Sequence, residues 1–388
     1  MLSFWYLCNL VFIPFLRENN KMKKALIHDW LDLYGGAERV LTAISEIYEF
    51  DFYYAYVNKM SQKDLNRTFQ NKPIVVEDSK KFKGFKFFFR FLMPFFPYLV
   101  KSFNKQTKNN EIDLVISSSW ALSKGYRIGN ETHISYLHCR NFKYVWDEAY
   151  LYFKGPFKLL SFLKKPLREF DIKSAQNPDY LITNSKFVQN WVRQKYNRES
   201  TVIYPPVEVE EFYISNEKED YFIPVGRIVT CKRFEIIVEA FARNGKNLLI
   251  VGDGSARKKL EKNAPPNVKF IGFKTKEELK TLLSKARAFV FSAEEDFGIA
   301  IVEALASGIP VIAYSGGAST ELITNENGIL YNQQSSEALN KTLKEFIDKE
   351  HCFEPKKIRE SAMKFSKKRF QKEFSSYIDK IIANKKIK

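Results

Sequence analysis

The chain has 388 residues, of which 62 are Lys or Arg and 45 are Asp or Glu, so its formal net charge at pH 7 is +17. Hydrophobic residues make up 45% of the sequence, which is enough to bury real cores and excludes a disordered chain, a collagen-like repeat and a disulfide scaffold. The length predicts two domains or three, and the charge predicts an anionic partner such as nucleotide phosphate, lipid head groups or nucleic acid.

The cysteines and histidines are few. The four Cys residues form no CxxC pair, which argues against a zinc ribbon or a redox motif and favours a reducing compartment. The four His residues lack metal-ligand spacing, so no structural metal is expected.

Residues 1–21 form an apolar N-terminal extension. Residues 1–16 are nearly all apolar, but the run is shorter than the roughly 20 residues that span a bilayer, and Pro14 interrupts it. It also lacks the basic start and the small-residue cleavage site of a signal peptide. The extension is therefore either a membrane anchor or a misassigned start before Met22, which opens MKKALIHDW.

From Met22 onward, short apolar runs alternate with helical patterns, which predicts βαβ units and parallel sheets. Pro205 and Pro206 divide the chain into two α/β halves of similar size, so we expect two doubly wound, Rossmann-like domains at 22–206 and 207–365 that face one cleft. The expected strands are 24–28, 112–117, 133–137, 180–183 and 201–204 in the first half, and 221–225, 248–251, 269–271, 288–291, 311–313 and 328–330 in the second.

The segment 80–108 is rich in Lys, Arg, Phe and Tyr and contains no acidic residue. Projected as a helix, residues 81–93 place Lys83, Lys86 and Arg90 on one stripe and aromatic residues on the opposite side. This segment either binds an anionic membrane surface, or its Phe residues pack in the core while its Lys residues are solvated.

Two glycines and two cations follow predicted strands. Gly35 and Gly36 open a helix directly after the first strand, where backbone N–H groups can approach an anion, although a tight turn explains the pair equally well. Arg227 and Lys232 follow the first strand of the second half and can neutralise a pyrophosphate. Taken alone, they can also be two solvated surface charges.

The most specific local pattern runs from Glu295 to Glu303 and continues into EALASGIPVIA. A helix is expected over 299–307, so the backbone amides of its N-terminal residues would face an anion; these residues are Phe297, Gly298 and Ile299. Glu295 and Glu303 would bind a sugar and a ribose, or they merely complement the helix dipole. His138 ends a predicted strand and points to the same cleft, unless it is a structural histidine.

Taken together, GGAER at 35–39, GR(x)4K at 226–232, GDG at 252–254 and E(x)7E at 295–303 resemble family-4 glycosyltransferases of the GT-B fold. The resemblance extends from Met22 to near residue 370. The stretches IHDWLDLYGGAERVL and SYLHCRNFKYVWD are most similar to the O-antigen mannosyltransferase subgroup. One departure is Asp296, which stands where a glycine is usual; spacing favours Glu295 over Glu294 as the first glutamate of the motif.

The resemblance implies a retaining transfer of a hexose, with mannose favoured, from a nucleotide-diphosphate sugar to a lipid-linked or polysaccharide acceptor in cell-surface glycan synthesis. It implies an acceptor-side first domain, a donor-binding second domain, and a last helix at 366–388 that crosses back to the first domain. The donor is expected to be GDP-mannose, or else a UDP-sugar, with no metal or other cofactor. The enzyme would work in the cytoplasm at the inner face of the plasma membrane.

The resemblance also implies a role for each candidate residue. Arg227 and Lys232 would hold the pyrophosphate, Glu295 the sugar hydroxyls, and His138 would lie beside the transferred sugar; these are the expected catalytic residues. Gly35 and Gly36 would contact the donor phosphates or the acceptor region. The remaining donor-binding residues would be Phe297, Gly298, Ile299 and Glu303. No carboxylate is placed as an obvious covalent nucleophile, so a front-face displacement within one ion pair is expected.

Two other classes of protein share parts of this pattern. A nicotinamide-dependent oxidoreductase also has Rossmann halves, but it needs a G-x-G-x-x-G turn, and GGAER lacks that spacing. A basic nucleic-acid- or membrane-binding protein without catalysis would explain the net charge, yet no nucleic-acid motif is present and the charge is spread along the chain. No nucleic acid is therefore expected as a partner.

Overall fold

The structure is a computed structural model that describes residues 22–32, 34–69, 75–78, 93–143, 145–153 and 155–386. The apolar extension 1–21 and the predicted basic helix with Lys83, Lys86 and Arg90 lie outside the described residues.

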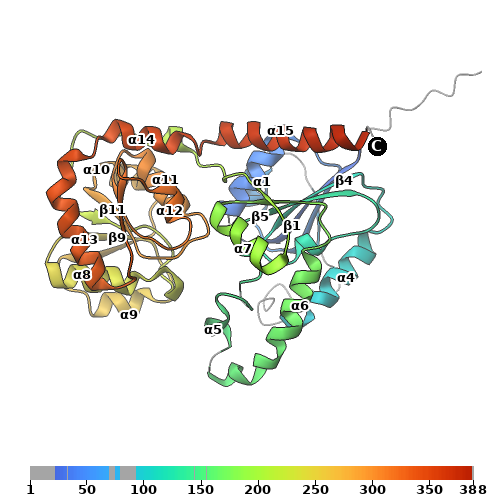
Figure 1. The fold of residues 1–388 in the computed structure, drawn as a ribbon, viewed down its shortest axis with the longest axis horizontal. Coiled ribbons are helices and arrows are strands. Elements are labelled where there is room, and N and C mark those ends of the chain that lie inside the picture. The colour runs from blue at the N-terminus through green and yellow to red at the C-terminus, as the bar shows by residue number, and fades with distance from the viewer. Residues whose placement is uncertain are drawn as a thin grey trace, which may run out of the picture.

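The first domain is built on a seven-stranded parallel sheet in the order β3-β2-β1-β4-β5-β6-β7 (Figure 1). Its central strands are buried on both faces, as in α/β folds in which helices cover both sides of the sheet. The strands are β1 Lys24–Leu31, β2 Phe52–Asn58, β3 Val76–Asp78, β4 Leu114–Ser119, β5 Thr132–Leu137, β6 Tyr180–Thr183 and β7 Thr201–Val202. The helices are α1 Gly36–Ile47, α2 Gln62–Thr68, η2 Met93–Phe95, α4 Phe96–Thr107, η3 Ser123–Gly125, α5 Ala149–Tyr152, η4 Gly155–Leu163, α6 Lys164–Ser174 and α7 Lys186–Tyr196.

The second domain carries a six-stranded parallel sheet in the order β10-β9-β8-β11-β12-β13. Its strands are β8 Phe222–Ile223, β9 Leu248–Val251, β10 Val268–Gly272, β11 Ala288–Phe291, β12 Val311–Tyr314 and β13 Gly328–Tyr331. Its helices are η5 Val209–Glu211, η6 Thr230–Lys232, α8 Phe234–Asn244, α9 Arg257–Lys262, α10 Lys276–Lys285, α11 Ile299–Ala306, α12 Ser319–Leu322, α13 Ser336–Lys349, η7 Glu350–Cys352 and α14 Pro355–Met363.

Both sheets reverse their strand order at one point, between β1 and β4 in the first domain and between β8 and β11 in the second. Ligands of doubly wound sheets bind outside the carboxyl ends of the strands at such a point. The predicted two-domain α/β fold is confirmed, and the loops after these four strands are where a functional site is expected.

The last helix, α15 Lys367–Lys386, leaves the second domain and lies along the first (Figure 1). Its apolar side joins the core that α1 and the first sheet form, through Phe370, Phe374, Ile378 and Ile381. Lys367 forms an ion pair with Glu46 of α1 at 2.9 Å. These contacts hold α15 on the first domain.

Two strands of the first sheet are absent from the sequence-based expectation, β2 and β3. β2 consists largely of aromatic residues, and Tyr54 and Tyr56, on one face of the sheet, are both buried. β3 has only three half-buried residues at the edge of the sheet. The strands β7 and β8 are shorter than expected, with two residues each.

Candidate functional site

Lys232 and Glu295 meet at the switch point of the second sheet. Lys232 ends η6, in the loop after β8, and Glu295 lies in the loop after β11. The Lys232 ammonium donates a hydrogen bond to the Glu295 carboxylate, and both side chains are about one-fifth exposed. A cation and a carboxylate thus lie together where the sequence places the pyrophosphate and sugar contacts.

Arg227 lies in the same loop as Lys232, and its side chain is exposed. Among the described residues, the Arg227 guanidinium makes neither a hydrogen bond nor an ion pair, so its charge is available to a ligand. The loop is held from behind by the GDG motif, because a Cβ atom on Gly252 would come within 1.9 Å of the Gly226 carbonyl oxygen. Only glycine permits this close approach of two backbones.

The loop that carries Glu295 is held by the turn that follows β12. The Ala318 N–H donates to the Glu295 carbonyl at 2.8 Å. Gly317 has φ +70°, and a Cβ atom there would lie 2.2 Å from the same carbonyl oxygen. The backbone of Glu295 therefore has one position, from which its side chain reaches Lys232.

Helix α11 begins beside this pair. Gly298 is its N-cap with φ +94°, and Ile299 is its first residue. The Phe297 side chain points into the core and packs against Tyr204 and Phe365, so only its backbone is placed to contact a ligand. The positive end of the α11 dipole faces the site.

Helix α1 of the first domain lies opposite the start of α11. A Cβ atom on Gly36 would lie 2.7 Å from Cδ1 of Ile299, so the two domains touch at this glycine. The Gly35 N–H donates to Oε2 of Glu38 at 2.9 Å. In this structure the Gly35 N–H is therefore already hydrogen-bonded to the Glu38 carboxylate, although the resemblance implies that this N–H contacts a donor phosphate.

Glu303, on the second turn of α11, is bound by Arg39 of α1, with Nη1 and Oε1 2.7 Å apart. Both side chains are largely buried. The second glutamate of the E(x)7E motif is thus neutralised by the first domain, and Arg39 is a site residue that the sequence analysis did not identify.

His138 joins a second histidine through a serine hydroxyl. Oγ of Ser118 lies 2.5 Å from Nε2 of His138 and 2.9 Å from Nδ1 of His28. Burial and the neighbouring His28 hold the pKa of His138 well below its usual range, so its ring is neutral. His28 and Ser118 lie at the carboxyl half of β1 and β4, at the switch point of the first sheet.

The loop after β4 is held by Asp29. Its carboxylate accepts hydrogen bonds from four successive backbone N–H groups, those of Trp120, Ala121, Leu122 and Ser123. Because Asp29 follows His28 directly, these bonds tie the segment that carries His28 to the loop after β4.

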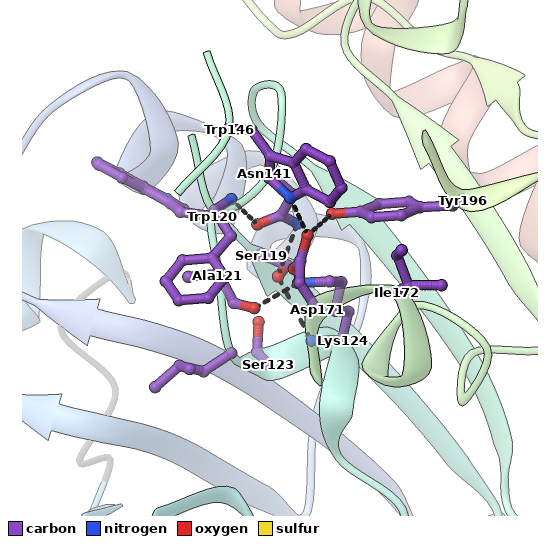
Figure 2. A network of polar contacts seen from close by, with 12 residues as sticks. Ser119, Trp120, Ala121, Ser123, Lys124, Asn141, Trp146, Asp171, Ile172 and Tyr196 are labelled. Carbon is purple, nitrogen blue, oxygen red and sulfur yellow. Dashed lines mark hydrogen bonds and ion pairs between the residues drawn. The ribbon is translucent and has the colours of Figure 1, made fainter. Parts of the chain in front are cut away.

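Behind the same loop lies a network of polar contacts with a buried ion pair at its centre (Figure 2). Lys124 forms an ion pair with Asp171 of α6, with Nζ and Oδ1 2.7 Å apart and neither side chain exposed. The other oxygen of Asp171 accepts hydrogen bonds from Trp146 Nε1 and the Tyr196 hydroxyl, each at 2.7 Å. The network connects the loop after β4 to the loop after β5, which carries His138 and Arg140.

Arg140 connects the loop after β5 to the second domain. Its Nε lies 2.7 Å from Oδ1 of Asp296, and its Nη1 lies 2.5 Å from Oε1 of Glu294. Burial lowers the pKa of Arg140, but these carboxylates outweigh it and raise the pKa above its ordinary value. The two residues on either side of Glu295 are thus both held by one arginine, which leaves Glu295 itself to Lys232.

The arrangement brings together most of the predicted site residues. Lys232 with Glu295, and Gly36 with Ile299, are in direct contact, and Glu303 lies next to them on α11. In the part of the chain that the structure describes, no hydrogen bond, ion pair or ring contact joins His138 to the second domain. Among the described residues, no cluster of three or more His, Cys, Asp or Glu is placed to hold a metal ion. No helix in the described part of the chain is long and apolar enough to cross a membrane.

The GT-B fold consists of two parallel-sheet domains with this strand order and a last helix that crosses back to the first domain. Solved structures share this fold. The Anabaena protein HepE in complex with UDP and glucose superposes with a TM-score of 0.70 over 92% of this chain and 100% of that one, at 18% identity. Sucrose-phosphate synthase from Thermosynechococcus elongatus gives a TM-score of 0.70 over 94% and 100%, at 19% identity. The GT-B fold that the resemblance implied is confirmed.

Residues 208–369 match the family described as glycosyl transferases group 1. An uncharacterized glycosyltransferase of Methanocaldococcus jannaschii is 31% identical over 208 residues, which are 52% of this chain and 58% of that one. The O-antigen chain mannosyltransferase of Salmonella typhimurium is 34% identical over 188 residues, 44% of this chain and 52% of that one. The chain spans about half the length of these curated relatives. The glycosyltransferase resemblance is confirmed for the second domain, and the alternative classes are not favoured.

Proposed function

We propose that the protein is a retaining glycosyltransferase that moves a mannosyl residue from GDP-mannose to a lipid-linked or polysaccharide acceptor. The observation that carries the proposal is the pairing of Lys232 with Glu295 beside the N-terminus of α11. The names of three relatives support the donor, because the mannosyltransferases of Mycobacterium tuberculosis and Corynebacterium glutamicum are described as GDP-mannose-dependent.

The leaving diphosphate would be bound by charge. Arg227 and Lys232 supply two cations, and the α11 amides add the positive end of a helix dipole. Fixed charges of this kind stabilise the negative charge that develops on a leaving group without reorganising during the reaction. We propose that they do so without a metal ion.

The two glutamates would position the donor's sugars. Once the diphosphate is bound by Lys232, the Glu295 carboxylate is free to accept hydrogen bonds from the mannose hydroxyls. Glu303 would accept from the two ribose hydroxyls, which requires that Arg39 share or release its carboxylate. Release of this carboxylate by Arg39 would loosen the contact between α1 and α11.

The bond changes are those of a displacement on one face of the sugar. The bond between the mannose C1 and the β-phosphate oxygen breaks, and its electron pair leaves with GDP. The acceptor hydroxyl oxygen forms a bond to C1 on the same face, and its proton passes to the departing phosphate oxygen. His138, neutral and fixed through Ser118, would lie beside the sugar and accept a hydrogen bond from it.

The acceptor would be carried at a membrane. The net charge of +17 favours an anionic surface, and an acceptor linked to a lipid would bring the enzyme to the inner face of the plasma membrane as a peripheral protein.

A ligand screen followed by product analysis tests the proposal. Thermal shifts are measured with GDP, UDP and ADP and with their sugars, and transfer is then measured with the stabilising donor, with and without EDTA. We expect GDP-mannose to stabilise most, EDTA to leave the rate unchanged, and the product to keep the α-configuration in its NMR spectrum. A larger thermal shift with a UDP-sugar would show that the donor is a UDP-sugar and not GDP-mannose. An inverted product or a trapped glycosyl-enzyme would overturn the mechanism.

A further inference from the structure

The segment 149–165 exposes large apolar side chains next to the domain interface. It comprises α5, η4 and the start of α6, which extend away from the first sheet (Figure 1). Leu159 is 84% exposed, Phe162 70% and Tyr150 65%. Side chains of this size, gathered on one short segment, mark an interaction site because isolated domains rarely expose them together.

The charge of the same segment has one sign. No Asp or Glu occurs between Glu148 and Glu169, whereas five basic residues do: Lys154, Lys158, Lys164, Lys165 and Arg168. Of these, Lys158 and Lys165 are exposed. Exposed aromatic and leucine side chains between lysines match the layered chemistry of an anionic bilayer, with apolar chains beneath phosphate groups.

The base of the segment is firmly held, so its exposure is not that of a loose end. Leu167 is buried, and Leu163 and Phe153 pack against the core beneath the first sheet. Nε of Arg168 donates to the Val145 carbonyl at 2.8 Å, and its guanidinium lies over the Trp146 ring. No residue in the described part of the chain covers Leu159 or Phe162.

We propose that the segment 149–165 docks the protein onto an anionic lipid bilayer. It rests on the surface, since no described helix is long and apolar enough to cross a membrane. A second copy of the chain is a poor occupant, because it would bring an equally positive surface to the contact. The proposal deepens the proposed function by naming the surface that meets a lipid-linked acceptor.

The position of the segment along the chain places the docked membrane near the site. Residues 140–148 lead directly into it, and within them Arg140 holds Glu294 and Asp296 of the second domain. A lipid-linked sugar at the head-group layer is therefore delivered to the domain interface, where Lys232 and Glu295 lie.

Vesicle binding by the full chain tests the docking. Partition is measured by flotation with vesicles of phosphatidylcholine alone and of equimolar phosphatidylcholine and phosphatidylglycerol. Two variants remove one property each: Leu159→Ser/Phe162→Ser removes apolar surface, and Lys158→Glu/Lys164→Glu/Lys165→Glu reverses charge. We expect either variant to lower partition onto the anionic vesicles by at least about tenfold.

Matched controls lie in the second domain. Phe273→Ser removes an apolar side chain that is 81% exposed, and Lys258→Glu/Lys259→Glu/Lys341→Glu changes the net charge by the same amount. We expect both controls to keep the wild-type partition. Thermal melting and the shift with GDP, unchanged in all four variants, show that the fold and the nucleotide site are intact.

The outcomes separate the docking from the catalytic proposal. Wild-type partition of either segment variant, or equal partition onto neutral and anionic vesicles, overturns the docking. A dimer in sedimentation velocity that only Leu159→Ser/Phe162→Ser abolishes also overturns it, in favour of a second copy. The expected vesicle results without any nucleotide-sugar binding would leave the docking in place and overturn the proposed function.

Discussion

Arg39 on α1 and Glu303 on α11 form an ion pair at 2.7 Å although 264 residues separate them in the chain. Each residue lies within the first two turns of a helix that follows a switch-point strand, one in each domain. The pair therefore connects the two halves of the site, and it places a cation on the carboxylate proposed for the ribose.

Replacement of Glu303 by Gln, compared with replacement of Arg39, separates the proposed ribose contact of Glu303 from its ion pair with Arg39. A ribose hydroxyl that loses a charged acceptor loses about 1.5–3 kcal/mol, so we expect nucleotide affinity to fall at least about tenfold in calorimetry. Arg39→Gln removes only the ion pair with Glu303. We expect this variant to keep its nucleotide affinity within about threefold of the wild type, while its radius of gyration in X-ray scattering increases. Equal losses of affinity in both variants would contradict the ribose assignment.

The cations of the second domain are expected to act on the rate. Loss of Lys232 or Arg227 by replacement with Ala removes stabilisation of the leaving diphosphate, which we expect to lower kcat on the order of 10²-fold. Both proteins are expected to fold, since both side chains lie in a loop at the domain surface. Lys258→Ala, at an exposed position of α9, is the control for a lost cation in the same domain. Near-normal turnover in either site variant would refute the assignment.

Arg140 is expected to position Glu295 without touching substrate. Arg140→Ala frees both Glu294 and Asp296, and we expect kcat to fall by about tenfold as the loop loses its fixed position. Asp296→Gly, which restores the glycine usual in the resembling family, keeps the Glu294 contact and is expected to lose less. Arg243→Ala is the control, because Arg243 pairs with two carboxylates within the second domain. A loss in that control equal to the loss in Arg140→Ala would exclude the positioning role.

Local patterns predicted the parts of the site that depend on neighbouring residues. The strands β6, β9 and β11 occur where apolar runs indicated them. The same holds for Lys232 and Glu295, because the carboxyl ends of adjacent parallel strands meet at one edge.

The contacts across the domain interface could not be predicted in this way. Arg39 and Arg140 find their carboxylates 264 and 156 residues away, and these pairings depend on how two separate domains sit together. The strand β2 was missed for another reason: it is buried on one face through Tyr54 and Tyr56 and on the other through Ala55 and Val57, so the sequence shows no alternation of polar and apolar residues.

The buried pair of Lys124 and Asp171 is expected to stabilise the first domain, because it holds the loop after β4 against α6. Lys124→Met leaves the Asp171 carboxylate buried without a cation, which we expect to lower the free energy of unfolding by about 3–5 kcal/mol. Lys124→Met/Asp171→Asn removes both charges and keeps acceptors for Trp146 and Tyr196, so we expect a smaller loss. Urea unfolding followed by tryptophan fluorescence measures both, with Lys173→Met at an exposed position of α6 as control. A double variant as unstable as Lys124→Met would contradict this account.

The stability of the first domain is expected to fall in mild acid because of His133. Burial first, and then Arg127, lower the pKa of His133 to about 3, so the folded chain keeps this ring neutral where the unfolded chain protonates it. Between about pH 3 and 6.5 the unfolded state therefore binds more protons, and stability declines as the pH falls, by about 1.4 kcal/mol per pH unit. We expect His133→Gln to lose about 2 kcal/mol less than the wild type between pH 7 and pH 5 in urea unfolding, whatever its stability at pH 7. In both proteins His138, whose pKa is also lowered, contributes to the decline of stability with falling pH, so part of this decline remains in His133→Gln. Identical slopes in the two proteins would show that His133 is not the group that the acid titrates.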